Sequence, residues 1–249
     1  MINIKSDSDL EKMKVANGIV RDFLYEVEDK VKPGVCTLEI DKFAREFIEK
    51  FGAKPSFLNY NGFPASICLS IDCEVVHGIP SKKRYIEEGQ IVSIDVGAFI
   101  NGYHGDAARS FLVGACSDDK KQLVEVTKQS FFKGIEKAVV GNRLGDLSHA
   151  IQAHAESFGY GVVRELCGHG IGTKLHEDPE VLNYGAAGRG VRFQKGMVIA
   201  VEPMINMGTE KVDFLKDGWT CVTRDRKPSA HYENTIAITG DGEPLILTL

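Results

Sequence analysis

The sequence predicts a fold of the α+β class, in which helices and strands occupy separate stretches of the chain. Apolar residues recur at helical spacing in one stretch and form β-branched, strand-like runs in the next, and this order occurs twice. Helices and strands segregated in this way favour α+β over a parallel, doubly wound sheet. The two halves also resemble each other weakly, since each ends in strands that carry two acidic residues.

Two helices are predicted before the first strands. Ser8 and Glu11 have the spacing of a capping box, which would open a helix over residues 8–30 with a repeating apolar face. A second helix is predicted over residues 37–51, where Gly52 stops it. Both helices precede the strand-like region of the first half.

The rest of the chain alternates in the same manner. Residues 66–113 carry β-branched and apolar runs cut by turns, which is typical of strands. A long helix is predicted over residues 118–140, with Gly141 at its end, and another over residues 146–158. Strands and glycine-rich turns are predicted from residue 161 to the C-terminus.

Length and composition indicate a single domain spanning residues 1–249, since no linker or low-complexity stretch divides the chain. Hydrophobic residues make up 43% and charged residues 26%, which are ordinary values for a globular protein. The net charge of -5 and a pI near 5.8 argue against a dedicated nucleic-acid-binding protein, which needs a basic surface. Nothing suggests an extended oligomerisation surface, so we expect a monomer.

Sequence features also indicate a cytoplasmic protein with no membrane association. No apolar run approaches the ~20 residues of a membrane span, and the N-terminus lacks the apolar core of a signal peptide. The 6 cysteines are dispersed without a CxxC pair, so we expect reduced thiols, each a small buried apolar residue.

Four acids and one histidine stand in apolar or glycine-rich segments, where a charge is costly to bury. They are Asp95, Asp106, His169, Glu202 and Glu233. A carboxylate buried without a partner loses its hydration or is forced to take up a proton. Four acids gathered together would repel one another unless cations compensated, so the pattern predicts bound metal.

The register of one hairpin places two of these acids. Asn101 and Gly102 form a strong two-residue hairpin signal, because both residue types accept positive φ. If they form the loop, Gly97 faces Asp106, and Asp95 lies diagonally across on the same face. Their backbones would be about 7–8 Å apart, within reach of one metal centre. Unrelated surface acids on a hairpin are the alternative, which the apolar strand disfavours.

The imidazole comes from the segment CGHGIG. In extended backbone Gly168, Gly170 and Gly172 would line one face, which lets a substrate or a second strand approach closely, and His169 would lie on the other. His176 lies seven residues after His169, past a turn, so the two histidines do not form an i,i+4 ligand pair on a helix. A purely structural histidine is the alternative.

The last two acids lie in separate strand-like runs. Glu202 stands in VIAVEPM, an apolar run that otherwise predicts a buried strand, and Pro203 indicates that the strand ends there at a rim. Glu233 stands in HYENTIAIT near His231, where a half-exposed strand glutamate is the alternative.

One imidazole and four carboxylates without a thiolate describe a hard, oxygen-rich site. Such a site favours Mn, Fe(II), Co or Zn over a structural cysteine-zinc site. Four acids exceed what one ion needs. The sequence therefore predicts two divalent metal ions, about 3.5–4 Å apart with shared carboxylates.

Five segments in order resemble signatures of the bacterial-type type I methionine aminopeptidase family: HGIP, IDVGAFINGYHGDAARSF, GHGIGTKLHEDP, VEPM and SAHYENTIAIT. The resemblance covers residues from about 8 to 248. It implies a pita-bread (creatinase/aminopeptidase-like) fold, a pseudo-symmetric α+β arrangement of antiparallel sheet with helices on one side.

The resemblance also implies roles for individual residues. The five acids and histidine would be the metal ligands, with Asp106 and Glu233 bridging two ions, and His77 and His176 would assist catalysis beside them. The substrate methionine pocket would draw on His77, Tyr60, Phe63, Cys68, His176 and Trp219. Core packing is the alternative for the aromatic residues, and Trp219 could simply anchor a loop.

Three positions depart from the family pattern. Leu175 stands where well-known bacterial members carry Phe, Phe57 where a small residue is common, and Ala107 where Thr is frequent. The contour of the pocket and the relative rates depend on these positions, whereas the metal centre does not.

The implied reaction is removal of the initiator methionine from newly made, deformylated polypeptides whose second residue is small. A water bound at the dinuclear centre would attack the scissile carbonyl, with Glu202 taking its proton. His176 and His77 would stabilise the tetrahedral intermediate and handle the leaving amine. The nascent N-terminus is thus the expected partner, together with a transient contact with the ribosome.

Two alternatives remain. One is an Xaa-Pro aminopeptidase or dipeptidase of the same fold, although such enzymes usually carry a further N-terminal domain and the HGIP and SAHYENT segments favour methionine removal. The other is a non-catalytic pita-bread binding protein, which typically lacks metal ligands. A comparison of Met-Ala-Ser with an Xaa-Pro peptide separates the first, and metal analysis separates the second.

Overall fold

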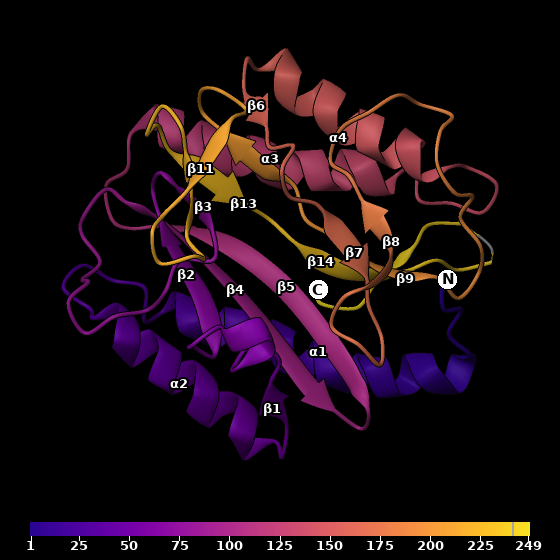
Figure 1. Cartoon of the computed structure of the whole chain (residues 1–249), viewed down its shortest axis with the longest axis horizontal. Helices are drawn as coiled ribbons and strands as arrows, with labels where there is room; N and C mark the ends of the chain where they lie inside the picture. The colour runs from indigo at the N-terminus through magenta and orange to yellow at the C-terminus, as the bar shows by residue number, and fades with distance from the viewer. Residues whose placement is uncertain (241) are drawn as a thin grey trace.

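The elements follow the predicted order of helices and then strands, twice over (Figure 1). A computed structural model describes residues 1–240 and 242–249. The first half comprises α1 (Asp7–Glu28), α2 (Thr37–Lys50), β1 (Lys54–Pro55), the short 3₁₀ helix η1 (Tyr60–Gly62), β2 (Ile67–Ile71), β3 (Glu74–Val76), β4 (Ile91–Ile100) and β5 (Tyr103–Leu112). The second half comprises α3 (Asp118–Ile135), α4 (Leu144–Ser157), β6 (Gly161–Val162), β7 (Gly168–Gly170), β8 (Glu177–Val181), β9 (Val198–Val201), β10 (Met204–Asn206), β11 (Val212–Phe214), β12 (Cys221–Thr223), β13 (Ser229–His231), β14 (Asn234–Ala237) and β15 (Leu245–Ile246).

The first helix begins earlier than predicted. Ser6, not Ser8, is its N-cap, and the capping box is closed by Asp9 instead of Glu11. The Ser6 hydroxyl accepts from the Asp9 N–H, and the Asp9 carboxylate accepts from the Ser6 N–H at 2.9 Å. Two serines of equal capping chemistry lie within one turn here, so the local pattern alone does not choose between them.

The helices of the second half are shifted at their ends. After Ile135 the backbone tightens, since Ala138 N–H donates to Ile135 O at 2.9 Å, and the predicted continuation to residue 140 is wrong. In α4, Asp146 is not the first residue. Its carboxylate accepts from the Arg143 N–H at 2.7 Å, so the helix begins one residue after Arg143, at Leu144.

Antiparallel pairing runs through every sheet of the described residues. The β4–β5 hairpin keeps one register along its whole length, from Ile100 opposite Tyr103 to Ile91 opposite Leu112, and β1 and β2 also pair with β4. A second sheet has the order β15-β14-β9-β7-β8. Smaller sheets join β13-β10-β6 and β11-β12-β3.

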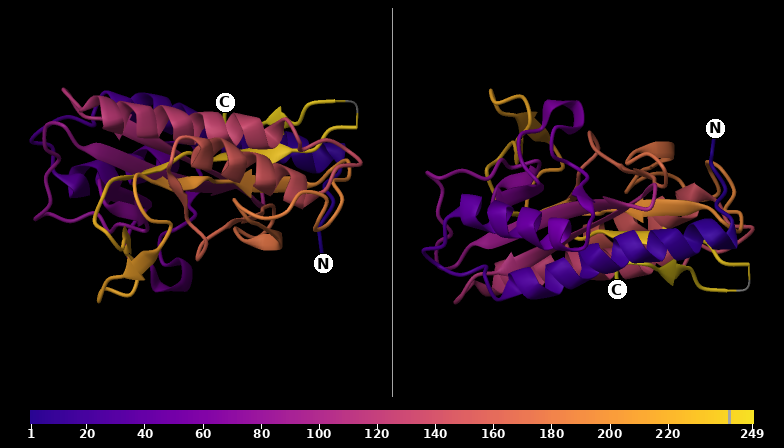
Figure 2. Two further views of the ribbon diagram at one scale, coloured as in Figure 1. Left: turned by 90° about the horizontal axis from the view of Figure 1, so that it is seen from above. Right: turned by 90° about the horizontal axis from the view of Figure 1, so that it is seen from below.

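Apolar faces of the helices cover the strands from one side (Figure 2). Phe23 of α1 and Phe47 of α2 are buried against apolar residues of the β4–β5 hairpin, and Phe131 of α3 is buried with Ile199 and Ile236 of the second sheet. Burial of side chains this large supplies most of the stabilisation of such layers. No helix in the described part of the chain has the length and apolar character needed to span a membrane. Loops cover the face of the sheets that lies opposite the helices (Figure 2).

Candidate metal centre and substrate cavity

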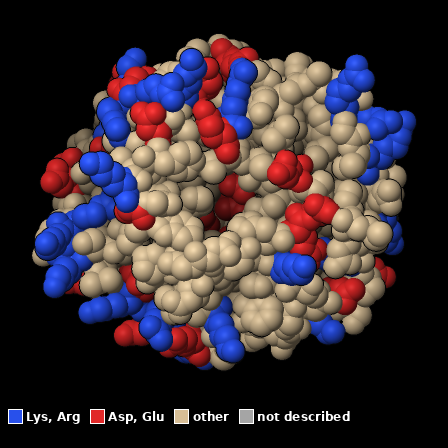
Figure 3. All heavy atoms as spheres, in the orientation of Figure 1, with Lys and Arg blue, Asp and Glu red and all other residues tan. Residues whose placement is uncertain are grey.

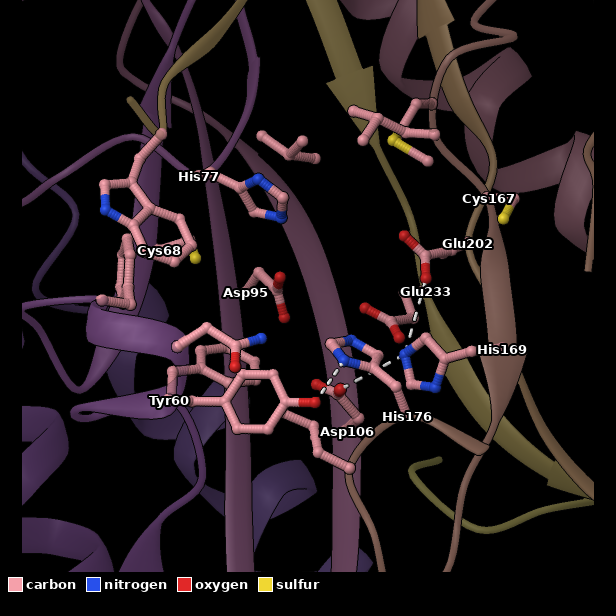
Figure 4. Close-up of a pocket in the computed structure, with 18 residues that line it drawn as sticks. Tyr60, Cys68, His77, Asp95, Asp106, Cys167, His169, His176, Glu202 and Glu233 are labelled. Atoms are coloured by element: carbon pink, nitrogen blue, oxygen red, sulfur yellow. Dashed lines mark hydrogen bonds and ion pairs between the residues drawn. The ribbon is translucent and has the colours of Figure 1, made fainter. Parts of the chain in front are cut away.

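The face opposite the covering helices is hollowed at its middle, and acidic side chains lie at the bottom of the hollow (Figure 3). The cavity there has a volume of about 300 Å³. All of the predicted site residues line it: Tyr60, Phe63, Cys68, His77, Asp95, Asp106, His169, His176, Glu202, Trp219 and Glu233. The structure therefore brings together every residue that the sequence placed in one site (Figure 4).

Asp95 and Asp106 occupy the hairpin positions predicted from Asn101 and Gly102. Asp95 pairs with Ala108 and Gly97 with Asp106, so both carboxylates project from one face (Figure 4). The absence of a side chain at Gly97 is required, because a Cβ atom there would lie 2.8 Å from the Cβ of Ser56.

His169, Glu202 and Glu233 come from three adjacent strands. His169 of β7 pairs with Ala200 of β9, and Glu202 follows the end of β9, as Pro203 indicated. Glu233 directly precedes β14, which pairs with β9 through Asn234 and Val201. The ends of three neighbouring strands thus converge on one point.

Glycines permit this close packing around the imidazole. A Cβ at Gly168 would lie 2.3 Å from Ala200 O, and one at Gly170 would lie 2.1 Å from Asp178 O. The predicted glycine face is therefore confirmed as a surface for neighbouring strands, which hold His169 on both sides. The Nδ1 atom of His169 is hydrogen-bonded to Gly170 O at 2.9 Å, so Nε2 faces the acids.

The acids are too close and too deeply buried to be ionised together without a cation. Burial raises the pKa of Asp95 from 3.8 to about 7. Burial and then the charges of neighbouring acids raise the pKa of Asp106, Glu202 and Glu233 well above the usual range. Burial lowers the pKa of His169 to about 3, so its imidazole is neutral and its Nε2 lone pair is free to ligate.

Unpartnered oxygens show that the site fits metal ions. Oδ1 of Asp95, Oδ1 of Asp106 and Oε1 of Glu233 are buried without a hydrogen-bond partner among the described residues. Ligand atoms of Asp106, His169 and Glu233 lie within 4.8 Å of one another. Glu202 Oε1 lies 3.7 Å from His169 Nε2. Orphaned carboxylate oxygens around a neutral imidazole have the chemistry of a divalent-cation site.

Two further histidines flank the acids, as the family resemblance implied. Burial lowers the pKa of His77 to about 4 and also lowers the pKa of His176, so both rings are neutral. Nδ1 of His176 is hydrogen-bonded to the Tyr60 hydroxyl at 2.9 Å, and its ring meets that of His169 edge-on at 4.2 Å. His176 thus lies between an aromatic hydroxyl and a predicted metal ligand.

An apolar recess lies beside the acids. Phe63 and Trp219 pack edge-to-face at 5.2 Å, and Cys68 stands on β2 opposite Asp95. Burial and the neighbouring acids raise the pKa of Cys68 well above the usual range, so it is an uncharged thiol. Trp219 lines the cavity.

The three departures from the family pattern fall in two places. Phe57 and Leu175 line the cavity and belong to the apolar cluster around it, so they shape its contour. Ala107 points away from the acids into the core between the hairpin and α1. The sheet therefore separates the side chain of Ala107 from the cluster of acids.

His231 is a polar residue at the site that the sequence interpretation did not include. Its Nε2 lies 3.7 Å from Glu202 Oε2 and 3.9 Å from Glu233 Oε2. The available signal was its spacing, because a residue two positions before Glu233 on an extended strand shares its face.

Comparison with known proteins agrees with this geometry. A model of metallopeptidase family M24 matches residues 11–240. The chain is 56% identical to a methionine aminopeptidase of Clostridium acetobutylicum, covering 100% of the chain and 99% of that protein. It is 50% identical to methionine aminopeptidase 1 of Bacillus subtilis, covering 97% of each.

Solved structures show the same similarity. The crystal structure of methionine aminopeptidase from Rickettsia prowazekii superposes with a TM-score of 0.98 at 43% identity, covering 100% of both chains. A prolidase from Pyrococcus furiosus superposes with a TM-score of 0.81 at 23% identity, covering 99% of this chain and 65% of the prolidase. The second likeness concerns the fold alone, which is the predicted pita-bread arrangement.

Proposed function

The chain belongs to metallopeptidase family M24, and on that premise we propose that it is a methionine aminopeptidase that removes the initiator methionine from newly made polypeptides. The observation that supports this most directly is that the acid cluster adjoins an apolar recess within one cavity. An unbranched thioether side chain fits a recess of aromatic rings and a thiol. The peptide bond behind it then lies at the acids.

We infer that the centre holds two divalent metal ions, drawn from Mn, Fe(II), Co and Zn. The ligands would be Asp95, Asp106, His169, Glu202 and Glu233, whose side chains line one cavity. When bound, such ions polarise the scissile carbonyl and lower the pKa of a water molecule toward neutrality. The four acids would supply the negative charge that two divalent ions require.

The remaining residues act on protons and on orientation. The Tyr60 hydroxyl, when it donates to Nδ1 of His176, leaves Nε2–H of that ring as a donor to the carbonyl oxygen and then to the tetrahedral intermediate. Glu202 is the candidate acceptor for the proton of the attacking water. His77, across the acids from His169 (Figure 4), would handle the leaving amine.

Several properties of the protein follow from this proposal. Residues 1–249 would form one catalytic domain, because the family match spans nearly all of the chain. Nascent chains are the substrate, so the site of action would be the cytoplasm, with the ribosome as a transient contact of a monomeric enzyme. By its resemblance to the family, the protein should cleave only before a small second residue.

The decisive experiment compares peptides after metal replacement. The protein is treated with chelator, reloaded separately with Mn, Fe(II), Co or Zn, and assayed on Met-Ala-Ser, Met-Leu-Ser and an Xaa-Pro peptide. We expect cleavage of Met-Ala-Ser alone, restored by at least one metal. Cleavage of the Xaa-Pro peptide in preference would indicate a prolidase-like activity. Metal binding without cleavage of any peptide would indicate a binding protein.

A further inference from the structure

His231 is buried next to Glu202 and Glu233, and hydrogen bonds hold its backbone in place. It ends β13, where it pairs with Met204 of β10. Its N–H donates to the Ser110 hydroxyl at 2.9 Å, and that hydroxyl donates to His231 O at 3.0 Å. The residue is only 1% exposed. These contacts fix the backbone position from which the ring of His231 extends toward the acids.

The ring of His231 relates to the acids much as His169 does. His169 Nε2 lies 3.7 Å from Glu202 Oε1 and 3.8 Å from Asp106 Oδ2. His231 Nε2 lies 3.7 Å from Glu202 Oε2 and 3.9 Å from Glu233 Oε2. Glu202 is thus placed between two imidazoles, with one oxygen toward each.

The Nε2 atom of His231 is an orphan. It is buried and has no hydrogen-bond partner among the residues that the structure describes. A neutral imidazole carries one N–H, and Nε2 is a buried donor when it holds that proton. A buried donor without an acceptor is costly, and the two carboxylates are the nearby acidic acceptors.

We propose that His231 is a positioning residue, whose Nε2–H donates to Glu202 Oε2 and so orients the other carboxylate oxygen toward the metal ions. The distance of 3.7 Å exceeds a hydrogen bond by roughly 0.5 Å, a gap that a small rotation of the Glu202 carboxylate closes. Donors of this kind to ligating carboxylates commonly strengthen metal binding. This inference rests on the proposed metal centre.

The test exploits the shapes of two amides. Nε2 of glutamine can occupy the place of histidine Nε2, whereas the amide of asparagine reaches only as far as Nδ1. The variants are therefore His231→Gln, His231→Asn and His231→Leu. His154→Leu serves as the matched control, because His154 is an imidazole on α4 that does not line the cavity.

The first readout is metal binding by titration calorimetry with Mn²⁺ on chelator-treated protein. We expect His231→Leu and His231→Asn to weaken binding of the more weakly held ion by about 10–100-fold. The affinity of His231→Gln for that ion should stay within about threefold of the affinity of the unmodified protein. The kcat on Met-Ala-Ser should fall in parallel with little change in KM, because the methionine recess is untouched. The absorption spectrum of Co²⁺-loaded His231→Gln should match that of the unmodified protein.

The proposal is overturned if His231→Asn binds metal as well as His231→Gln, or if His231→Leu binds it as well as the unmodified protein. It is also overturned if His231→Gln changes the Co²⁺ spectrum, since that would make His231 a direct ligand. Thermal unfolding in chelator checks that each variant is folded, and the Gln–Asn comparison suffices should the Leu variant not fold. Failure of the unmodified protein to bind metal or cleave Met-Ala-Ser would instead reject the proposed function.

Discussion

Glu233 and Ala108 exchange backbone hydrogen bonds across the two halves of the chain. The Glu233 N–H donates to Ala108 O at 3.0 Å, and the Ala108 N–H donates to Glu233 O at 3.4 Å. Arg109 reinforces the junction, because its guanidinium stacks on Tyr232 and donates to the carbonyl oxygen of Glu233 at 2.5 Å. This contact brings the acids of the first half within reach of those of the second.

We expect Asp106→Asn to abolish turnover without loss of the fold. Asparagine has the same shape but no charge, so it removes a proposed metal ligand and also relieves repulsion among the acids. Activity on Met-Ala-Ser should fall by more than about 100-fold. Loss of a residue that only hydrogen-bonds a metal ligand typically costs about 10–100-fold, so a larger loss indicates a direct ligand. The midpoint of thermal unfolding in chelator should be unchanged or higher.

His169→Ala should likewise abolish turnover, with His154→Ala as the control that removes an imidazole away from the cavity. Substantial activity of Asp106→Asn or His169→Ala, measured with metal present, would show that these residues are not essential metal ligands.

Metal stabilisation should grow as pH rises from about 4 to about 7. The pKa of Asp95 is raised to about 7 in the folded site without metal, against 3.8 for the free side chain. Over this range the unfolded chain ionises while the folded site retains its proton, so the contribution of Asp95 to the stability of the metal-free protein falls. A metal ion binds the ionised carboxylate, so protonated Asp95 opposes metal binding, and this opposition weakens as the pH approaches 7. His169, whose pKa is lowered to about 3, stays neutral throughout.

The measurement is the difference in unfolding temperature with Mn²⁺ and with chelator, taken at intervals across that pH range. A difference that stays flat or shrinks as pH rises would contradict the raised pKa of the acids. Asp95→Asn supplies the control, because its slope should be smaller than that of the unmodified protein.

Local chemistry made part of the site predictable. Asn101 and Gly102 fixed the hairpin register, and hence the shared face of Asp95 and Asp106, within a short stretch of chain. The pairing of Ala108 with Glu233 joins segments far apart in sequence, and no local pattern specifies it. The family resemblance supplied that association in place of physical derivation. The spacing of His231 from Glu233 was visible in the sequence, whereas its approach to Glu202 on a different strand was not.

Gly170→Ala should disrupt the site through the backbone. Its new Cβ would lie 2.1 Å from Asp178 O, so β7 and β8 cannot keep their pairing and His169 is displaced. Gly18→Ala is the matched control, since Gly18 lies within α1 with nothing within 4 Å of a new Cβ. That control should gain roughly 0.5–1 kcal/mol of stability.

Urea unfolding and metal titration of both glycine variants provide the measurement. The expected pattern is opposite in sign, with Gly170→Ala less stable and impaired in metal binding. Equal stability of the two variants would show that β7 tolerates a side chain at this position.

Lys5→Met should destabilise the protein and impair catalysis through His176. Lys5 Nζ lies 2.6 Å from Glu177 Oε2, and the side chains are 3% and 7% exposed. Removal of the lysine leaves the buried Glu177 carboxylate without its cation, and loss of one partner of a buried ion pair typically costs about 3–5 kcal/mol. The double variant with Glu177→Gln should recover much of that loss, because no buried charge then remains. Lys14→Met, which breaks the exposed pair with Glu11, should change stability by less than about 1 kcal/mol.

Chemical denaturation of the unmodified protein, Lys5→Met, Glu177→Gln and the double variant forms a double-mutant cycle that measures the coupling, and Lys14→Met serves as the exposed reference. Because Glu177 directly follows His176, the single variant should also lower kcat more than it raises KM, and the double variant should restore part of kcat. A stability loss without any change in kcat would mean that the buried pair holds only the N-terminal segment in place. In that case His176 would be positioned by its hydrogen bond to Tyr60 alone.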